Sequence, residues 1–242
     1  MKIAGYHSVL EALEENRAIE KVFVLQSAQT ARIRELIAKL KKKNIPVSFV
    51  PKEKLHRLSP DKNISIAAFL SPINYVSPEQ LVEEAFSASE TPVFLLLDGI
   101  TDTRNLGAII RSAVAFGVAG IFLPANNSAP VTEETVRMST GNIFKVPLSR
   151  VSHLKDAVFL LKASGVEIIA ASEKTQENLE TYTFSKPVAL LVGNEHKGIN
   201  PSLLKTADKM LKINMENNVD SLNVSVATAV FLYEIRKQLS SL

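Results

Sequence analysis

Three short groups between residues 98 and 227 combine polar side chains with glycine or small neighbours. The first motif is Asn105-Leu106-Gly107 with Arg111, the second is Gly193-Asn194-Glu195 with Gly198, and the third is Ser221-Leu222-Asn223-Val224-Ser225. Polar groups of this kind can position a substrate through hydrogen bonds, and glycine lets the main chain approach a ligand closely. Each motif follows an apolar, strand-like run, so all three can converge on one cleft.

Several other chemistries lack support in this sequence. The chain has no cysteine, which excludes disulfides, thiolate zinc sites and cysteine nucleophiles. Its four histidines do not have the spacing of metal ligands, so no metal centre is expected. The glycine-rich fingerprints of dinucleotide-binding domains and of phosphate-binding loops are both missing, which argues against an oxidoreductase or a kinase.

The composition is that of a folded protein with a mild basic bias. The 242 residues are 46% hydrophobic, enough for one large domain or, as we prefer, two modest ones. The net charge of +3 and the pI near 9.0 suit a polyanionic partner, although many ordinary soluble enzymes share them. No apolar run approaches the roughly 18 residues of a membrane span, and no signal peptide precedes the first helix, so we expect a soluble cytoplasmic protein.

Hydrophobic periodicity predicts a small α/β domain over residues 1–71. The expected helices begin near residues 6 and 33, and the expected strands cover 21–25, 46–50 and 64–70. The second helix ends in Lys39 and Lys41–Lys43, which could follow an RNA backbone or simply form a solvated helix end. Residues 71–92 hold three prolines and a small polar stretch. Residues 72–91 are predicted to be a linker in which 81–86 could form a short helix.

The remaining residues, 92–242, alternate short apolar runs with helical segments. The runs are 93–97, 120–123, 167–171, 188–192 and 210–213. Such a pattern predicts parallel strands that are covered on both faces.

The order and residue types of the three motifs resemble the SpoU/TrmH branch of the SPOUT RNA methyltransferases. Gly5-Tyr6-His7-Ser8-Val9, which opens the first helix, also looks like the start of that branch's N-terminal RNA-binding domain. The resemblance implies an α/β fold with a C-terminal SPOUT-type parallel sheet and a trefoil knot, plus the small N-terminal α/β RNA-binding domain. It implies transfer of a methyl group from S-adenosylmethionine to a ribose 2′-hydroxyl of RNA. The layout looks most like the enzymes that modify a guanosine of 23S ribosomal RNA; the alternatives are a tRNA 2′-O-methyltransferase and a non-catalytic RNA-binding scaffold.

Site residues follow from the same resemblance. It implies catalytic or substrate-facing roles for Arg111, Asn105, Glu195, Ser221 and Asn223. It implies a cofactor site, partly of backbone groups, at Gly193, Asn194, Gly198, Ile213, Met215, Leu222 and Val224. No metal is required, because methyl transfer depends mainly on positioning.

Arg111 is the residue that the resemblance assigns to activation of the 2′-hydroxyl. A guanidinium is a poor general base, because it is effectively always protonated. Either an RNA phosphate held by Arg111 accepts the proton, which we favour, or the site deprotonates the guanidinium itself. Taken alone, a helical arginine is more often a surface salt-bridge partner, but the motif favours the functional role.

The last helix is expected to begin with Ser221 as its cap. Its apolar stripe, Val224, Ala227, Phe231, Ile235 and Leu239, suits a core or a dimer interface. Because the family also completes its RNA site across two subunits, we predict a homodimer through this C-terminal helix. One stretch, Ser139–Asn142, departs from the family pattern of a small alanine after the glycine, so the RNA pocket is expected to differ there in detail.

Overall fold

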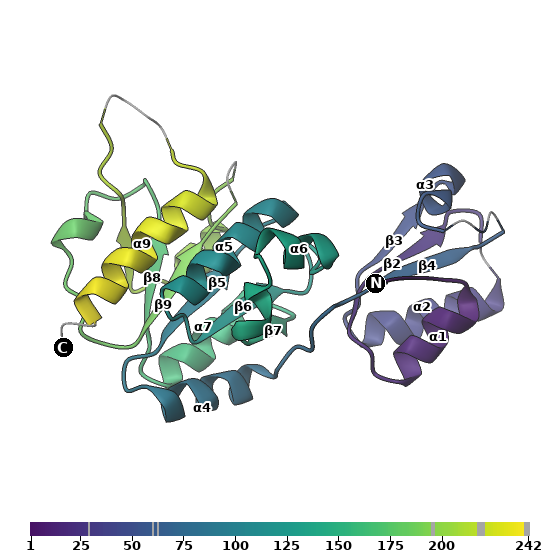
Figure 1. The fold of residues 1–242 in the computed structure, drawn as a ribbon, viewed down its shortest axis with the longest axis horizontal. Coiled ribbons are helices and arrows are strands. Elements are labelled where there is room, and N and C mark those ends of the chain that lie inside the picture. The colour runs from purple at the N-terminus through teal and green to yellow at the C-terminus, as the bar shows by residue number, and fades with distance from the viewer. Residues whose placement is uncertain (29, 60, 62, 195–196, 217–220, 240–242) are drawn as a thin grey trace. The chain divides into compact units, whose positions relative to one another are not determined.

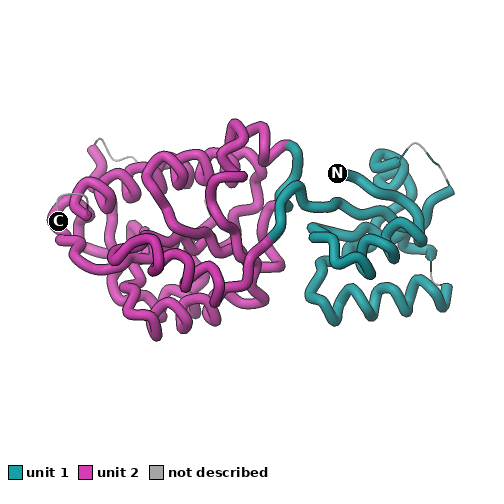
Figure 2. Tube along the Cα trace, turned by 60° about the horizontal axis from the view of Figure 1, so that its bottom comes forward, with its two compact units in different colours: residues 1–74, 130–133 teal, residues 75–129, 134–242 magenta. Residues whose placement is uncertain are grey.

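The chain forms two compact units in a computed structural model. The structure describes all residues except 29, 60, 62, 195–196, 217–220 and 240–242. Unit 1 consists of residues 1–74 and 130–133, and unit 2 consists of residues 75–129 and 134–242 (Figure 2).

Unit 1 is a four-stranded sheet with helices on both faces. The strand order is β1 (Lys2–Ala4), β4 (Ile66–Leu70), β2 (Ile19–Leu25) and β3 (Val47–Val50), and only the β2–β3 pair is parallel. Helices α1 (Tyr6–Glu14) and α2 (Ala31–Lys42) bury their apolar sides against one face. The short helix α3 (Lys52–His56) places Leu55 against the other face. The predicted helices and strands of this region are therefore present, together with β1 and α3, which the sequence pattern did not indicate.

A segment from the middle of the chain completes unit 1. Glu20 on β2 has only 2% of its surface exposed, and its carboxylate accepts a hydrogen bond from the Val131 backbone N–H (2.9 Å). The side chain of Val131 is fully buried. A buried carboxylate is costly unless it is hydrogen-bonded, so the segment 130–133 satisfies a polar group of this unit.

Unit 2 is built on a six-stranded parallel sheet. Its order is β10 (Lys209–Leu211), β8 (Glu167–Ala171), β9 (Val188–Val192), β5 (Val93–Leu97), β6 (Gly120–Pro124) and β7 (Leu148–Val151). All five neighbouring pairs are parallel. The prediction of a buried parallel sheet is thus confirmed. The chain passes from β5 to β6 on one side and from β9 to β10 on the other, so the direction of the strand connections reverses between β5 and β9. Ligands of open α/β sheets bind at the carboxyl ends of the strands beside such a reversal.

Helices cover both faces of this sheet (Figure 1). One face carries α4 (Pro78–Ala88) and α7 (Leu154–Ala163), whose apolar residues share a core with the strands. The other carries α5 (Thr103–Ala115) and α9 (Val224–Leu239), which lie side by side. The shorter helices are α6 (Glu133–Met138), η1 (Asn142–Lys145), η2 (Leu179–Thr181) and α8 (Pro201–Leu204). Among the described helices, none combines the length and apolar character that crossing a bilayer requires.

Residues 72–91, expected as a linker, contain helix α4. Ser77 accepts a hydrogen bond from the Gln80 N–H (3.2 Å), and Pro78 occupies the first turn, where its missing N–H costs nothing. Leu81, Val82 and Ala85 are buried in the core of unit 2. Most of this stretch is therefore an integral part of the second unit.

The apolar stripe expected on the last helix lies in the core of the chain. Val224, Phe231, Ile235 and Leu239 are all buried within unit 2. The interpretation of this stripe as a subunit interface is therefore wrong. A different face of α9, formed by Val226, Val230 and Tyr233, is exposed.

Candidate active site

The three motifs meet at the carboxyl edge of the unit 2 sheet. The first motif follows β5, the second follows β9, and the third follows β10 and includes the first two residues of α9. Because β5 and β9 are neighbours at the reversal of winding, residues about ninety positions apart become adjacent there.

Two hydrogen bonds join the loops after β5 and β9. The side-chain amide of Asn194 donates to the Gly99 carbonyl (2.8 Å). The backbone N–H of Asn200 donates to the Asp98 carboxylate (2.7 Å). These bonds join the segment that precedes the first motif to the loop that carries the second.

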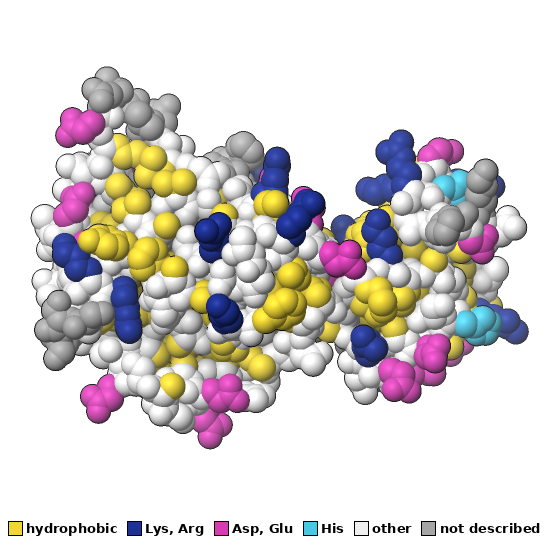
Figure 3. Space-filling model, in the orientation of Figure 1, with side chains coloured by type: hydrophobic (Ala, Val, Ile, Leu, Met, Phe, Trp, Pro, Cys, Tyr) yellow, Lys and Arg dark blue, Asp and Glu magenta, His cyan; other side chains and the backbone are white. Residues whose placement is uncertain are grey.

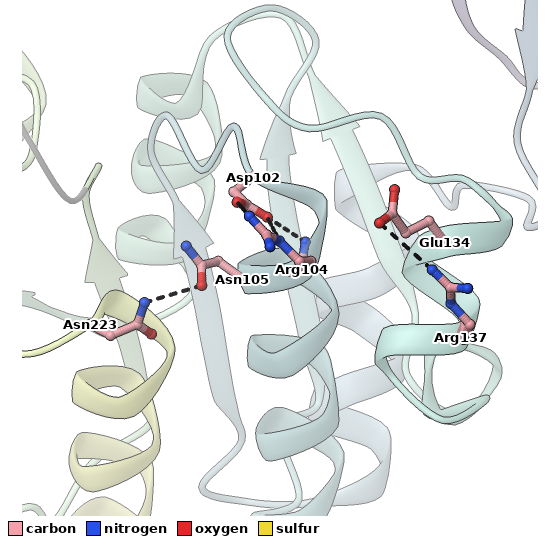
Figure 4. A network of polar contacts seen from close by, with 6 residues as sticks. All are labelled: Asp102, Arg104, Asn105, Glu134, Arg137 and Asn223. Carbon is pink, nitrogen blue, oxygen red and sulfur yellow. Dashed lines mark hydrogen bonds and ion pairs between the residues drawn. The ribbon is translucent and has the colours of Figure 1, made fainter.

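A third bond joins the first motif to the third. The amide nitrogen of Asn223 donates to the side-chain oxygen of Asn105 (3.2 Å), as Figure 4 shows. The oxygen of Asn223 accepts from the backbone N–H and the hydroxyl of Ser225 (2.9 and 2.6 Å). The same side chain, Asn223, therefore caps α9 through its oxygen and contacts the first turn of α5 through its nitrogen. The prediction that Ser221 caps this helix is wrong, because α9 begins at Val224 and Asn223 supplies the acceptor.

The two glycines of the second motif are needed for different reasons. Gly193 packs against main chain: a Cβ there would lie 2.3 Å from the Gly198 carbonyl carbon and 2.3 Å from the Ile199 nitrogen. Gly198 has open space around it but a φ of +67°, which favours glycine. Backbone bonds between Asn194 and Gly198 close the loop (3.1 and 2.8 Å). Glu195 lies between them, outside the described residues.

A cavity of about 470 Å³ opens beside these motifs, within the size range of small-molecule pockets. All seven residues predicted to bind the cofactor line it, together with Ser221: Gly193, Asn194, Gly198, Ile213, Met215, Leu222 and Val224. Leu222, Val224 and Phe231 give it an apolar wall. The cavity can therefore take a small organic molecule with both polar and apolar parts.

Sequence reasoning missed the charged part of the cavity lining. The additional residues are Glu173, Lys174, Lys197 and Lys212. A usable signal existed for the first two, since they directly follow the predicted strand 167–171 and strand ends carry the ligand sites of parallel sheets.

Arg111 lies outside the cavity lining, on the exposed side of α5. Seven residues make nearly two helical turns, so Arg104 and Arg111 share one face of α5, about 10 Å apart along the axis. The small residue Ala108 lies between them, and both arginine side chains are exposed. Among the described residues, Arg111 forms no ion pair. The alternative that Arg111 is a surface salt-bridge partner is therefore not supported for those residues.

Asp102 organises the first turn of α5. Its carboxylate accepts from the Arg104 backbone N–H (2.6 Å) and pairs with the Arg104 guanidinium (3.1 Å), both drawn in Figure 4. The side-chain hydrogen bond from Arg104 is the main cause that lowers the pKa of Asp102. The result is a helix cap that also holds one arginine in place. Within the described ranges, no three histidine, aspartate or glutamate side chains cluster as metal ligands would.

Comparison with known proteins places this arrangement in a family. The family model described as SpoU rRNA Methylase family matches residues 92–233. The chain belongs to this family. A second model, described as RNA 2′-O ribose methyltransferase substrate binding, matches residues 2–76. The match to the SpoU model covers most of unit 2 and all three motifs, and confirms the resemblance stated from the sequence.

Relatives of the SpoU chain match it along nearly its whole length. A TrmH family tRNA/rRNA methyltransferase of Staphylococcus saprophyticus is 30% identical over 96% of this chain and 94% of its own. The YacO protein of Bacillus subtilis, assigned to the same family, is 28% identical over 98% of this chain and 95% of its own. The structure of an AdoMet-bound rRNA methyltransferase from Sinorhizobium meliloti has a TM-score of 0.63 and 27% identity, covering 98% of this chain and 87% of that one.

Proposed function

We propose that this protein transfers a methyl group from S-adenosylmethionine to a ribose 2′-hydroxyl of ribosomal RNA. The observation that carries the proposal is a set of hydrogen bonds beside one cavity, which joins the loops after β5 and β9 and links Asn105 to Asn223. Family membership and the AdoMet-bound relative agree with it.

The cavity residues fit S-adenosylmethionine, which when bound supplies the methyl group. Main chain at Gly193 and Ile213 offers hydrogen-bonding groups, and Leu222, Val224 and Phe231 offer apolar surface. Glu173, Lys174 and Lys212 place charges of both signs on the lining, as a ligand with an amino and a carboxylate group requires.

Catalysis by this chain consists of positioning the nucleophile. Asn105 and Asn223, locked together outside the cavity lining, are proposed to orient the ribose. Arg111, exposed and unpaired among the described residues, is proposed to bind an RNA phosphate that accepts the hydroxyl proton. Ser221 and Glu195 remain proposed members of the same site.

Ribosomal RNA is the proposed substrate, with a guanosine as the target nucleoside. The match of residues 2–76 to a substrate-binding model supports an RNA-binding role for unit 1, beyond the catalytic unit. Transfer RNA is the second candidate, because a SpoU structure described as a TrmH/SpoU tRNA modifying enzyme of A. aeolicus is 27% identical over 67% of this chain (TM-score 0.57, 84% of that chain).

We also propose a homodimer through α9 and a knotted chain end. The exposed apolar face of α9, formed by Val226, Val230 and Tyr233, supports the homodimer. Twofold dimers are also the commonest oligomers. Family membership supports the proposed knot, and the packing of α9 on α5 after the edge strand β10 is compatible with it.

The function is tested by mapping 2′-O-methyl nucleotides by mass spectrometry. Ribosomal and transfer RNA from cells with and without the protein are compared, and purified protein with S-adenosylmethionine is then added to the unmodified RNA. We expect one ribosomal RNA site to lose its methyl group in the deletion strain and regain it in vitro. A site regained only in tRNA would favour the second candidate, and no lost site in either RNA would contradict the enzyme activity.

A further inference from the structure

Five exposed side chains form a basic and aromatic surface on α5, α6 and η1. They are Arg104, Arg111, Arg137, Phe144 and Lys145, which we call the basic–aromatic face. The three elements are held together: α5 contacts η1, and Gly107 of α5 lies so close to Met138 that a Cβ would be 2.4 Å from the Met138 Cβ. In Figure 3, basic side chains lie over α5 and α6, with an apolar patch close to them.

Phe144 is the unusual member of this face. With 63% of its surface exposed, it is more exposed than any other large hydrophobic side chain among the described residues. A phenylalanine ring that is mostly exposed among charged side chains is accessible to a ligand.

The loop before η1 holds Phe144 in a fixed place. Ser139 is buried, and its hydroxyl donates to the Val136 carbonyl (3.0 Å). The amide of Asn142 donates to the Ser139 carbonyl (2.9 Å) and to the Thr140 hydroxyl (3.1 Å). Thr140 has a φ of +50°, a conformation that is costly for a β-branched residue and must be maintained by these bonds. A ring presented on a pre-organised loop loses little entropy when it binds.

The charge of the face favours a polyanion. Between residues 102 and 149 the sequence has four basic residues, all on this face, and three acidic ones, Asp102, which pairs with Arg104, Glu133 and Glu134. Glu134 is offset by Arg137, at 3.9 Å. If two copies of the protein paired through this face, like charges would be brought together. Pairing through the apolar face of α9 would not bring like charges together.

We propose that the basic–aromatic face binds the single-stranded RNA next to the target nucleotide, with Phe144 stacked on a neighbouring base. Arg137 and Lys145 bind the flanking phosphates, and the strand continues along α5 past Arg104 to Arg111. Base stacking on aromatic rings combined with cations along the backbone is the general mode of single-strand recognition. This inference rests on the proposed function, because it places the strand beside the residues proposed to act on the ribose.

The test measures binding of full-length protein to fluorescein-labelled oligouridylate by fluorescence anisotropy at several salt concentrations. We expect Phe144→Ala to weaken binding about 5- to 150-fold, the effect of losing one stacked base, and Phe144→Tyr to stay within a few-fold of wild type. Lys145→Ala should also lower the slope of log affinity against log salt by about 0.7, the value for one phosphate contact on a single strand. Phe159→Ala is the matched control, because Phe159 is similarly exposed (59%) but lies on α7.

The outcomes separate this inference from the proposed function. Equal affinities of Phe144→Ala and Phe159→Ala would overturn the inference, as would a Phe144→Ala protein whose only change is a lower mass in light scattering. Wild-type protein that binds S-adenosylmethionine in calorimetry but does not bind oligouridylate would also overturn it. Wild-type protein that binds neither RNA nor S-adenosylmethionine would instead refute the proposed function.

Discussion

At the residue scale, the site separates the group that is proposed to act on the nucleophile from the groups that line the cavity. Arg111 lies on the open side of α5, whereas the predicted cofactor residues surround a cavity that does not include it. This separation makes the role of Arg111 testable independently of cofactor binding.

Replacing Arg111 with alanine should leave S-adenosylmethionine affinity within a few-fold of wild type. Methyl transfer should fall by about 10²- to 10⁴-fold, the usual effect of losing a proton-transfer or positioning group. Arg111→Lys should restore little, because an ammonium cannot hold a phosphate bidentately. Calorimetry and single-turnover transfer assays measure the two quantities. Loss of cofactor binding in Arg111→Ala, or near-normal transfer, would contradict the assigned role.

Asn223 has two tasks that a pair of variants can separate. Asn223→Ser keeps a side-chain oxygen for the α9 cap but is too short to bridge the 3.2 Å contact to Asn105, whereas Asn223→Ala loses both. We expect both variants to lose methyl transfer and only the alanine variant to lose about 0.5–2 kcal/mol of stability. Thermal unfolding and transfer rates provide the comparison. A serine variant with wild-type rate would show that the bridge is dispensable.

At the element scale, the loop after β9 depends on two glycines for different physical reasons. Gly193→Ala would drive a Cβ into the backbone of Gly198 and Ile199 and displace a wall of the cavity. We expect S-adenosylmethionine affinity to fall about 5- to 150-fold, in line with an overpacking cost of about 1–3 kcal/mol. Gly198→Asn, which tolerates a positive φ, should stay within a few-fold of wild type. Similar affinities of the two variants in calorimetry would refute this distinction.

Much of the element pattern could be predicted because the strands of unit 2 are buried on both faces. The runs at residues 93–97, 167–171 and 188–192 appear with the same bounds as β5, β8 and β9. The strand β7 was not predicted, because it is short and contains Ser149 and Arg150. The order of the strands could not be derived either, because periodicity describes a local face and says nothing about which distant strand becomes its neighbour.

Part of the cavity lining was predicted from the sequence, but its charged residues and the geometry around it were not. The resemblance supplied the residues of the cavity, yet the cap of α9 was assigned to Ser221 instead of Asn223, because several adjacent polar residues could each serve as a cap. The stripe on α9 was ambiguous for a related reason. A helical face that packs within its own chain and one that packs on a second subunit have the same period.

At the scale of the whole molecule, the open question is what covers the exposed face of α9. Tyr233 is 56% exposed and contacts the ring of Phe116 edge-on, and Val226 and Val230 continue the same face. Figure 3 shows hydrophobic side chains spread over this helix.

Introducing a charge into this face should separate the proposed dimer. We expect wild-type protein to have twice the subunit mass of 26.5 kDa in light scattering, and Tyr233→Glu to have the subunit mass, because burying an unpaired carboxylate is unfavourable. Phe159→Glu, on the exposed side of α7, should leave the mass unchanged. Wild-type protein that already has the subunit mass at micromolar concentration would contradict the dimer.

The non-contiguous make-up of unit 1 bears on how the protein is synthesised. Residues 1–74 leave the ribosome first, but the segment that donates to buried Glu20 is translated only after β5, α5 and β6 of the other unit. The N-terminal part of the nascent chain therefore cannot complete its hydrogen bonding until more than half of the protein has been made. A gene fragment that ends at residue 74 should accordingly yield a less stable product, whose buried carboxylate lacks this donor. Because the chain is synthesised from its N-terminus, unit 1 can form all of its hydrogen bonds only after part of unit 2 has been translated.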